Sequence, residues 1–147
     1  MDTVVGDETA VEEAFASADR TASVDLVNQR LVPNAMEPRA SVADYTPSSG
    51  ALTVDVTTQN PHLHRGWYAS MLGIPQGKIR VRAPRVGGGF GQKIHAYPAD
   101  GITAWASMQL GRPVKWTATR SETYLAGTHG RDHRTTIELA LSDEGSI

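Results

Sequence analysis

The stretch "RVGGGFGQK", residues 85–93, constrains this chain most, because four of its nine residues are glycines, which destabilise regular helices and strands. The segment before it, "KIRVRAPRV" (78–86), alternates apolar and basic residues, as in a strand with one buried side. A strand therefore leads directly into backbone without side chains. Either the stretch is a tight turn or bulge, or its bare amides bind an oxygen-rich ligand, with the N–H groups of Phe90 and the next residue pointing outward.

Two known glycine signatures do not fit this stretch. A phosphate-binding loop of the form G-x-x-x-x-G-K-[ST] requires a glycine before the lysine and Ser or Thr after it, where this chain has Gln92 and Ile94. The dinucleotide fingerprint G-x-G-x-x-G would need a glycine at one of the same two positions. The sequence therefore gives no support for a nucleotide phosphate as the ligand.

The apolar pattern along the chain predicts an α+β fold with mixed sheets and short packing helices. Helices are expected where apolar residues recur at helical spacing between caps, at 7–19 (with Thr9 as cap), 61–73 and 97–111. Strands are expected where residues alternate, at 21–32, 39–45, 51–59, 78–86, 112–120 and from 132 onward, with a hairpin turn at 46–50. The "DEG" turn at 143–145 leaves that last strand without its second arm, which predicts that the chain is part of a longer protein.

Composition narrows the classes of function. The 147 residues suffice for one core, and a net charge of −2 with scattered basic residues disfavours nucleic acid as a partner. There is no cysteine, so disulfides, thiolate nucleophiles and cysteine-bound metal centres are excluded and any redox centre must come from outside the segment. With no apolar run near the ~20 residues that span a bilayer and no signal peptide, the expected location is cytoplasmic.

Most other polar residues have simple structural interpretations. Two histidine pairs are expected to be solvated or capping, although the second has the spacing of one helical face: His62 with His64, and His129 with His133. Four carboxylates show no pairing and are expected at the surface or in turns: Glu37, Asp44, Asp55 and Asp100. Gln59 is different, because it ends a strand just before a helix. There its amide could donate to an oxo or phosphate oxygen, or could equally serve as an ordinary cap.

Six ordered segments together resemble one family. They are "RLVPNAMEPRASVADY", "TTQNPH", "MLGIP", "VRAPRVGGGFGQK", "YPADGITAWASMQLGRPVKW" and "TRSE" followed by "HGRD". In this order they resemble the molybdenum-binding large subunit of the xanthine dehydrogenase and aldehyde oxidase family, and most nearly the aerobic carbon monoxide dehydrogenase variety. The resemblance extends from about residue 10 to the end of the chain.

The resemblance implies a cofactor and residues that touch it. Members bind a molybdenum pyranopterin, for which a cytosine dinucleotide is one form, and oxidise a small substrate with oxygen from water. Their electrons leave through [2Fe-2S] clusters on a small subunit and FAD on a medium subunit. Carried over to this chain, the cofactor-binding residues are Gln59, Gly88, Gly89, Phe90 and Gly91, while Gly87, Gln92 and Lys93 are supporting residues.

The same resemblance sets limits. Purine-oxidising relatives have a glutamate where this chain has Ile94, so purines are disfavoured. The family's catalytic glutamate and the cysteine-bearing loop of carbon monoxide dehydrogenases lie farther downstream, so residues 1–147 are expected to form a partial molybdopterin-binding domain, truncated at its C-terminus. It would hold no catalytic residue and no direct metal ligand, and alone would be inactive. The alternative is a non-catalytic remnant or a module that binds partner subunits.

Overall fold

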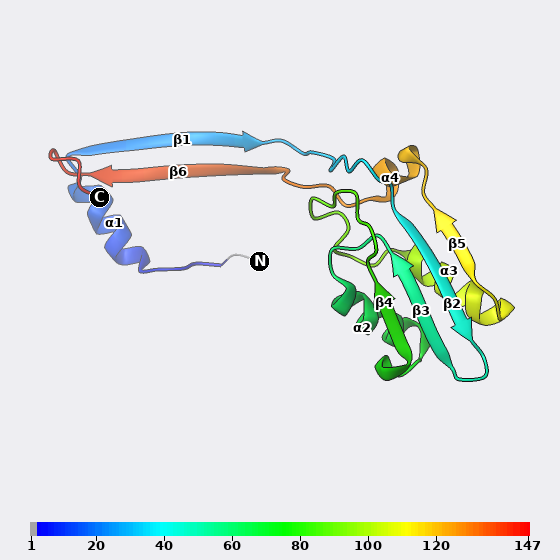
Figure 1. Cartoon of the computed structure of the whole chain (residues 1–147). Coiled ribbons are helices and arrows are strands. Elements are labelled where there is room, and N and C mark those ends of the chain that lie inside the picture. Colours follow the sequence, from blue (N-terminus) through cyan, green and yellow to red (C-terminus); the bar gives the residue numbers. More distant parts are fainter. Residues whose placement is uncertain (1–2) are drawn as a thin grey trace. The chain divides into compact units, whose positions relative to one another are not determined.

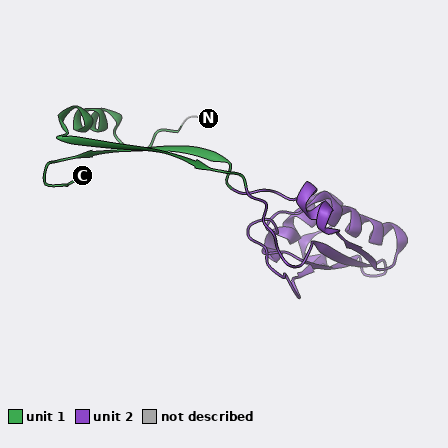
Figure 2. Cartoon of the chain, turned by 90° about the horizontal axis from the view of Figure 1, so that it is seen from above, with its two compact units in different colours: residues 1–30, 131–147 green, residues 31–130 purple. Residues whose placement is uncertain are grey.

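The computed structural model describes residues 3–147, and the chain divides into two compact units. One unit consists of residues 1–30 and 131–147, and the other of residues 31–130, as coloured in Figure 2. We call them the ribbon unit and the core unit. Each is described by itself below.

The core unit is built on a four-stranded mixed sheet, with strand order β4-β3-β2-β5 (Figure 1). Strands β2 and β3 are antiparallel, as are β2 and β5, whereas β3 and β4 are parallel. The parallel pair needs a crossover, which α2 and a short 3-10 turn, η1, supply. The elements of this unit are β2 (Ala40–Thr46), β3 (Ala51–Val56), α2 (Pro61–Leu72), η1 (Gln76–Lys78), β4 (Ile79–Arg82), α3 (Pro98–Leu110), β5 (Val114–Thr117) and α4 (Arg120–Ala126).

The two faces of this sheet differ because its central strands alternate. Ala43, Leu52 and Val54 point to one face, where they form a buried cluster with Tyr68 of α2 and Ala104 of α3. Figure 1 shows both helices on that one side of the sheet. The intervening residues form the other face, which carries an ion pair between Arg82 and Asp55 (Nε to Oδ1, 2.5 Å). The core therefore lies between the sheet and one layer of helices.

The helix ends follow local chemistry, and the sequence predicted most of them. Helix α2 begins at Pro61 and stops at Gly73, whose φ of 68° few other residues adopt; α3 stops in the same way at Gly111, with φ 60°. Helix α4 was not predicted, because seven residues are too few to show a helical period. Its start is nevertheless encoded by Thr119 and Glu122, each of whose side chains accepts from the other's backbone N–H.

The ribbon unit pairs β1 (Arg20–Asn28) with β6 (His133–Leu141) over nine residues each, next to α1 (Glu8–Ser17). The partner of the last strand is β1, far away in sequence, a pairing that the sequence pattern did not predict. The cap of α1 also differs from the prediction: Asp7, not Thr9, accepts from the N–H of Ala10 (3.1 Å).

Within residues 3–147 the predicted fold class is confirmed by a mixed four-stranded sheet covered by helices, together with an antiparallel pair of strands next to a helix. Within residues 3–147, no helix combines the length and the apolar character that crossing a membrane requires.

Candidate functional site

The glycine loop, residues 85–93, follows β4 and has the backbone conformation that its glycines allow. The φ angles of Gly87, Gly88 and Gly91 are 58°, 92° and 84°, values that residues with a side chain rarely adopt. Phe90 shares this conformation at φ 52° although it is not a glycine. Such a residue stores about 1–3 kcal/mol of backbone strain. The residue is 72% exposed, so its burial does not explain why the strain is kept.

Gln59 closes against this loop from the turn between β3 and α2. Its side-chain Oε1 accepts from the N–H of Gly91 (3.0 Å) and from the N–H of Lys93 (3.3 Å). A Cβ on Gly89 would lie 2.2 Å from the same oxygen, so any larger residue at this position would have to displace the Gln59 side chain. Because Oε1 faces the loop, the side-chain nitrogen Nε2 of Gln59 points away from these donors. No residue in 3–147 accepts a hydrogen bond from it.

The loop also leaves backbone donors unpaired. Within the described chain, the N–H groups of Gly88, Gly89 and Phe90 have no acceptor. The outward orientation expected for the residue after Phe90 was wrong, because the N–H of Gly91 is used by Gln59. Three amides and one carboxamide nitrogen therefore remain for an external acceptor.

The strand predicted over residues 51–59 ends at Val56, so Gln59 lies in the turn three residues later. There it is exposed rather than packed in the sheet. The structure brings it together with Gly89 and Gly91, as a shared site requires, and Phe90 stands next to them in the loop.

The supporting residues at the end of the loop are buried. Gln92 and Lys93 are each 1% exposed, which agrees with their predicted structural role. The Gln92 backbone carbonyl accepts from the hydroxyl of Tyr97 (2.6 Å), and the carboxamide of Gln92 donates to the carbonyl of Thr123 (3.4 Å). These contacts fix the loop to the start of α3 and to α4.

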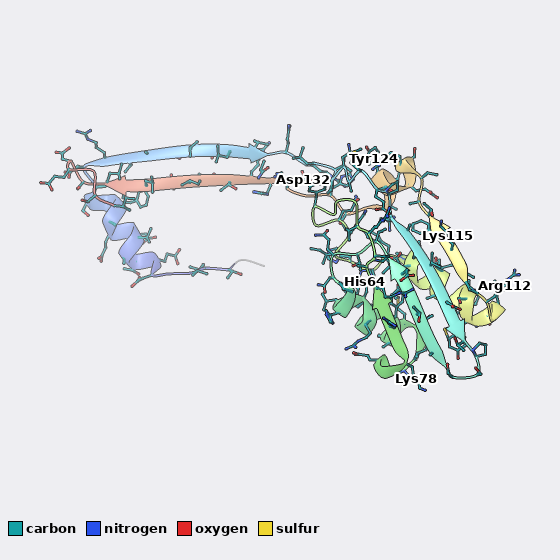
Figure 3. The ribbon with its side chains drawn as sticks, viewed as in Figure 1. His64, Lys78, Arg112, Lys115, Tyr124 and Asp132 are labelled. Carbon is teal, nitrogen blue, oxygen red and sulfur yellow. The ribbon has the colours of Figure 1, made fainter. Side chains whose placement is uncertain are left out.

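Two predicted surface groups are buried near this loop. His64 on α2 is 1% exposed, and its burial lowers the pKa of the imidazole, although the Ile94 and His95 backbone favours the charged form (Figure 3). Asp100 on α3 is 3% exposed; its burial raises the pKa of the carboxyl, whose Oδ2 accepts from the N–H of Tyr97 (3.0 Å). The second predicted histidine pair shares no helix face, since His133 is in β6.

Arg120 contributes to the site although sequence reasoning assigned it no role. Its guanidinium donates to the carbonyls of Ala35 (2.5 Å) and Met36 (2.7 Å). The segment it holds touches the glycine loop, where the N–H of Glu37 donates to the carbonyl of Gly87 (3.2 Å). On the same helix, α4, Tyr124 donates from its hydroxyl to Asn34 Oδ1 (2.9 Å; Figure 3). The capping box at Thr119 and Glu122 was the available sequence signal for this helix.

Residues 3–147 contain no group of three or more histidine and acidic side chains placed to hold a metal ion. A groove of about 320 Å³ borders the start of the glycine loop, with Glu37, Pro84 and Arg85 in its lining. The free donors of the loop are neutral backbone N–H groups. They fit an oxygen-rich, anionic group that approaches the backbone closely.

A mixed sheet thus leads into a glycine loop with free amides next to an exposed glutamine, a set of donors suited to an anionic group. The family model described as "Molybdopterin cofactor-binding domain" matches residues 2–147. The chain belongs to this family.

Known relatives agree with this assignment and with the resemblance noted in the sequence. The chain is 38% identical over 142 residues to the carbon monoxide dehydrogenase large chain of Hydrogenophaga pseudoflava, covering 97% of this chain and 18% of the relative. It is 37% identical to the nicotine 6-hydroxylase large subunit of Paenarthrobacter nicotinovorans, covering 93% and 17%.

Solved structures show the same fold. The Cu,Mo-containing carbon monoxide dehydrogenase matches with a TM-score of 0.87 at 35% identity, over 95% of this chain and 18% of that one. Quinoline 2-oxidoreductase from Pseudomonas putida 86 matches with a TM-score of 0.82 at 36% identity, over 90% and 17%. The chain thus spans less than a fifth of the length of these relatives.

Proposed function

We propose that the chain forms one side of the molybdenum pyranopterin site in the large subunit of a molybdenum hydroxylase. The observation that carries this proposal is the orientation of Gln59, whose Oε1 is fixed by the N–H groups of Gly91 and Lys93 so that its nitrogen remains free. A carboxamide held in this way keeps its donor in one place without a charge of its own.

When bound, the cofactor supplies the redox chemistry that inserts water-derived oxygen into a substrate. The residues of this chain bind and orient it. In our proposal Gln59 donates from its Nε2 to an oxo group, and the free N–H groups of Gly88, Gly89 and Phe90 face its anionic part, with Gly91 as the link to Gln59. Neutral, fixed donors stabilise negative charge without a group that could titrate or bind the metal.

The remaining functional assignments extend the same proposal. The cofactor could carry a cytosine dinucleotide, and electrons would pass to an iron–sulfur small subunit and an FAD-binding medium subunit in the cytoplasm. The relatives include a carbon monoxide dehydrogenase, a nicotine 6-hydroxylase and a quinoline 2-oxidoreductase, so this fold accompanies several substrates. Carbon monoxide, an aldehyde or an N-heterocycle would therefore be selected mainly by parts beyond this segment, and Ile94 disfavours purines.

The direct test uses a complete large subunit that contains this sequence, with Gln59→Ala compared with Gln76→Ala. Both glutamines are exposed, but Gln76 lies in η1 and makes no contact with the loop. We expect Gln59→Ala to lower molybdenum content or turnover at least about tenfold, as loss of one positioned donor does, while Gln76→Ala changes neither. Equal values for the two variants would contradict the proposal.

A second test concerns the isolated chain. It holds only part of the proposed site, so we expect the purified 147-residue protein to retain no molybdenum and to reduce no dye with aldehyde or carbon monoxide. Metal content by mass spectrometry and a dye assay check this. Stoichiometric metal with turnover would overturn the expectation, and stoichiometric cofactor without turnover would favour the alternative of a non-catalytic binding module.

A further inference from the structure

Lys93 is a buried ammonium at the end of the glycine loop. Of the three lysines in the sequence, Lys78 and Lys115 are exposed at the periphery of the core unit (Figure 3), whereas Lys93 is 1% exposed. A charge in the protein interior is unfavourable unless other groups replace its water. The contacts of Lys93 must therefore compensate for its burial.

Those contacts are backbone carbonyls. The Lys93 Nζ donates to the carbonyl of Glu37 (2.7 Å) and to the carbonyl of Val86 (2.5 Å). Within the described chain no carboxylate lies within ion-pair distance of this ammonium. Burial lowers the pKa of Lys93, while the nearby charge of Glu37 opposes that shift. The side chain thus joins the start of the glycine loop to residue 37.

The backbone of Lys93 holds the other end of the loop. Its carbonyl accepts from the N–H of Gln59 (2.9 Å) and from the hydroxyl of Thr58 (3.1 Å), and its N–H donates to Gln59 Oε1. One residue therefore fixes both ends of the loop and the glutamine that closes against it.

Arg120 extends this arrangement to the neighbouring segment. Its guanidinium holds the carbonyls of Ala35 and Met36, and Lys93 holds that of Glu37, so two cations bind three consecutive carbonyls. Ala35 in turn lies next to Gly88, whose added Cβ would be 3.4 Å from that of Ala35. We call Lys93 and Arg120 together the carbonyl clamp.

We propose that the carbonyl clamp is a positioning device, in which Lys93 and Arg120 hold the glycine loop in its ligand-accepting shape before any ligand binds. Apart from a contact of Arg120 with Asn34 Oδ1 (3.3 Å), the hydrogen bonds of the clamp go to backbone carbonyls and leave the free donors unoccupied, so the clamp acts through Gly88 to Phe90 and Gln59. The identity of the ligand rests on the proposed function, whereas the positioning role of the clamp is independent of that function. Such preorganisation improves binding because less order must be created when the ligand arrives.

The test is hydrogen exchange of the full chain, without cofactor, in Lys93→Met and in a matched control. Ser107→Ala is that control, since Ser107 is also buried and its hydroxyl makes two hydrogen bonds, to Tyr45 and Arg112, far from the loop. We expect Lys93→Met to speed exchange of the amides at positions 91 to 94 at least about tenfold more than in the β2–β3 strands. In the control, exchange at positions 91 to 94 should not rise, and the Tyr45 amide of β2, which loses its acceptor, is left out of the reference strands.

A Lys93→Met variant whose loop exchanges no faster than its strands would overturn the proposal. Should that variant not fold, Arg120→Gln provides the same measurement, because Arg120 is only half-buried and its loss leaves Lys93 in place. The same rise at positions 91 to 94 is expected, and its absence would equally overturn the clamp. The molybdenum content of a complete subunit carrying Lys93→Met tests the cofactor separately. Faster loop exchange without loss of molybdenum would support the clamp but argue against the proposed function.

Discussion

The two units of this chain show that long strands are not the same as a stable core. Strands β1 and β6 of the ribbon unit pair over nine residues each, yet every residue of β1 is exposed. Strands β2 and β3 of the core unit have seven and six residues, and alternate residues are buried by α2 and α3. The difference is the helix layer, because a two-stranded ladder alone offers little apolar burial.

The location of the candidate site follows from this difference. Gln59, Lys93 and the glycine loop all lie in the core unit, attached to elements that pack on its sheet. A constellation of amides keeps its geometry only on a rigid support. The described part of the ribbon unit has no comparable buried support: its apolar Val24 and Ile137 remain 46% and 43% exposed.

The largest expected effect compares the cores directly. Leu52→Ala should lower the free energy of unfolding by about 2–5 kcal/mol, since Leu52 is 1% exposed in the central cluster. Ile137→Ala in the ribbon should lower it by less than about 1 kcal/mol, because less apolar surface is buried there. Urea unfolding followed by circular dichroism measures both. Equal losses would contradict the prediction, because they would mean that Ile137 in the ribbon unit contributes as much to stability as Leu52 does in the core unit.

The next effect concerns the loop. Gly89→Ala should lower the free energy of unfolding by about 1–3 kcal/mol and remove protection of the Gly91 amide, because the added methyl would displace the Gln59 side chain. Gly77→Ala is the control, since a Cβ there meets no atom within 4 Å. Amide exchange of the two variants checks the prediction, which is wrong if Gly91 stays protected in Gly89→Ala.

His64 should make stability depend on pH. Its pKa in the folded state is below 6.5, its value when unfolded, so under pH 6.5 the unfolded chain binds a proton that the folded chain does not. The free energy of unfolding should therefore fall as the pH is lowered from about 7.5 to 5.5, by at most about 1.4 kcal/mol per pH unit. The raised pKa of Asp100 has the opposite effect on stability. As the pH falls toward 3.8, the pKa of this carboxyl in the unfolded chain, the folded chain binds the proton first and the free energy of unfolding rises.

Denaturant titrations across this pH range test the assignment. His64→Gln should reduce the slope, whereas His62→Gln, at an exposed position of the same helix, should leave it unchanged. An unchanged slope in His64→Gln would assign the pH dependence to other groups.

The smallest effect separates strain from packing at Phe90. Phe90→Gly should be more stable than Phe90→Ala by about 0.5–1 kcal/mol, because glycine adopts a φ of 52° without the strain that alanine keeps. Thermal unfolding of both variants measures the difference. A more stable alanine variant would show that the backbone of the free loop is not held in this conformation.

Local patterns in the sequence predicted much of the fold. Pro61 and Gly73 bound α2, and alternation in residues 51–56 marks β3 and its buried face, because caps and periodicity depend only on neighbouring residues. The sequence also singled out Gln59 and the glycines at 88, 89 and 91, whose exchange for other residues the structure restricts. Helix α4 was missed because it is short, and the pairing of β1 with β6 because its partners are more than 100 residues apart.

The sequence by itself determined the family, the order of the elements other than α4 and the backbone freedom of the glycine loop, since these depend on residue types and their spacing. Only the tertiary structure decided which amides stay free, because the N–H of Gly91 is taken by a residue 32 positions away. It also decided that His64, Lys93 and Asp100 are buried. The burial of a side chain depends on which distant residues pack against it, and the local sequence pattern does not contain that information.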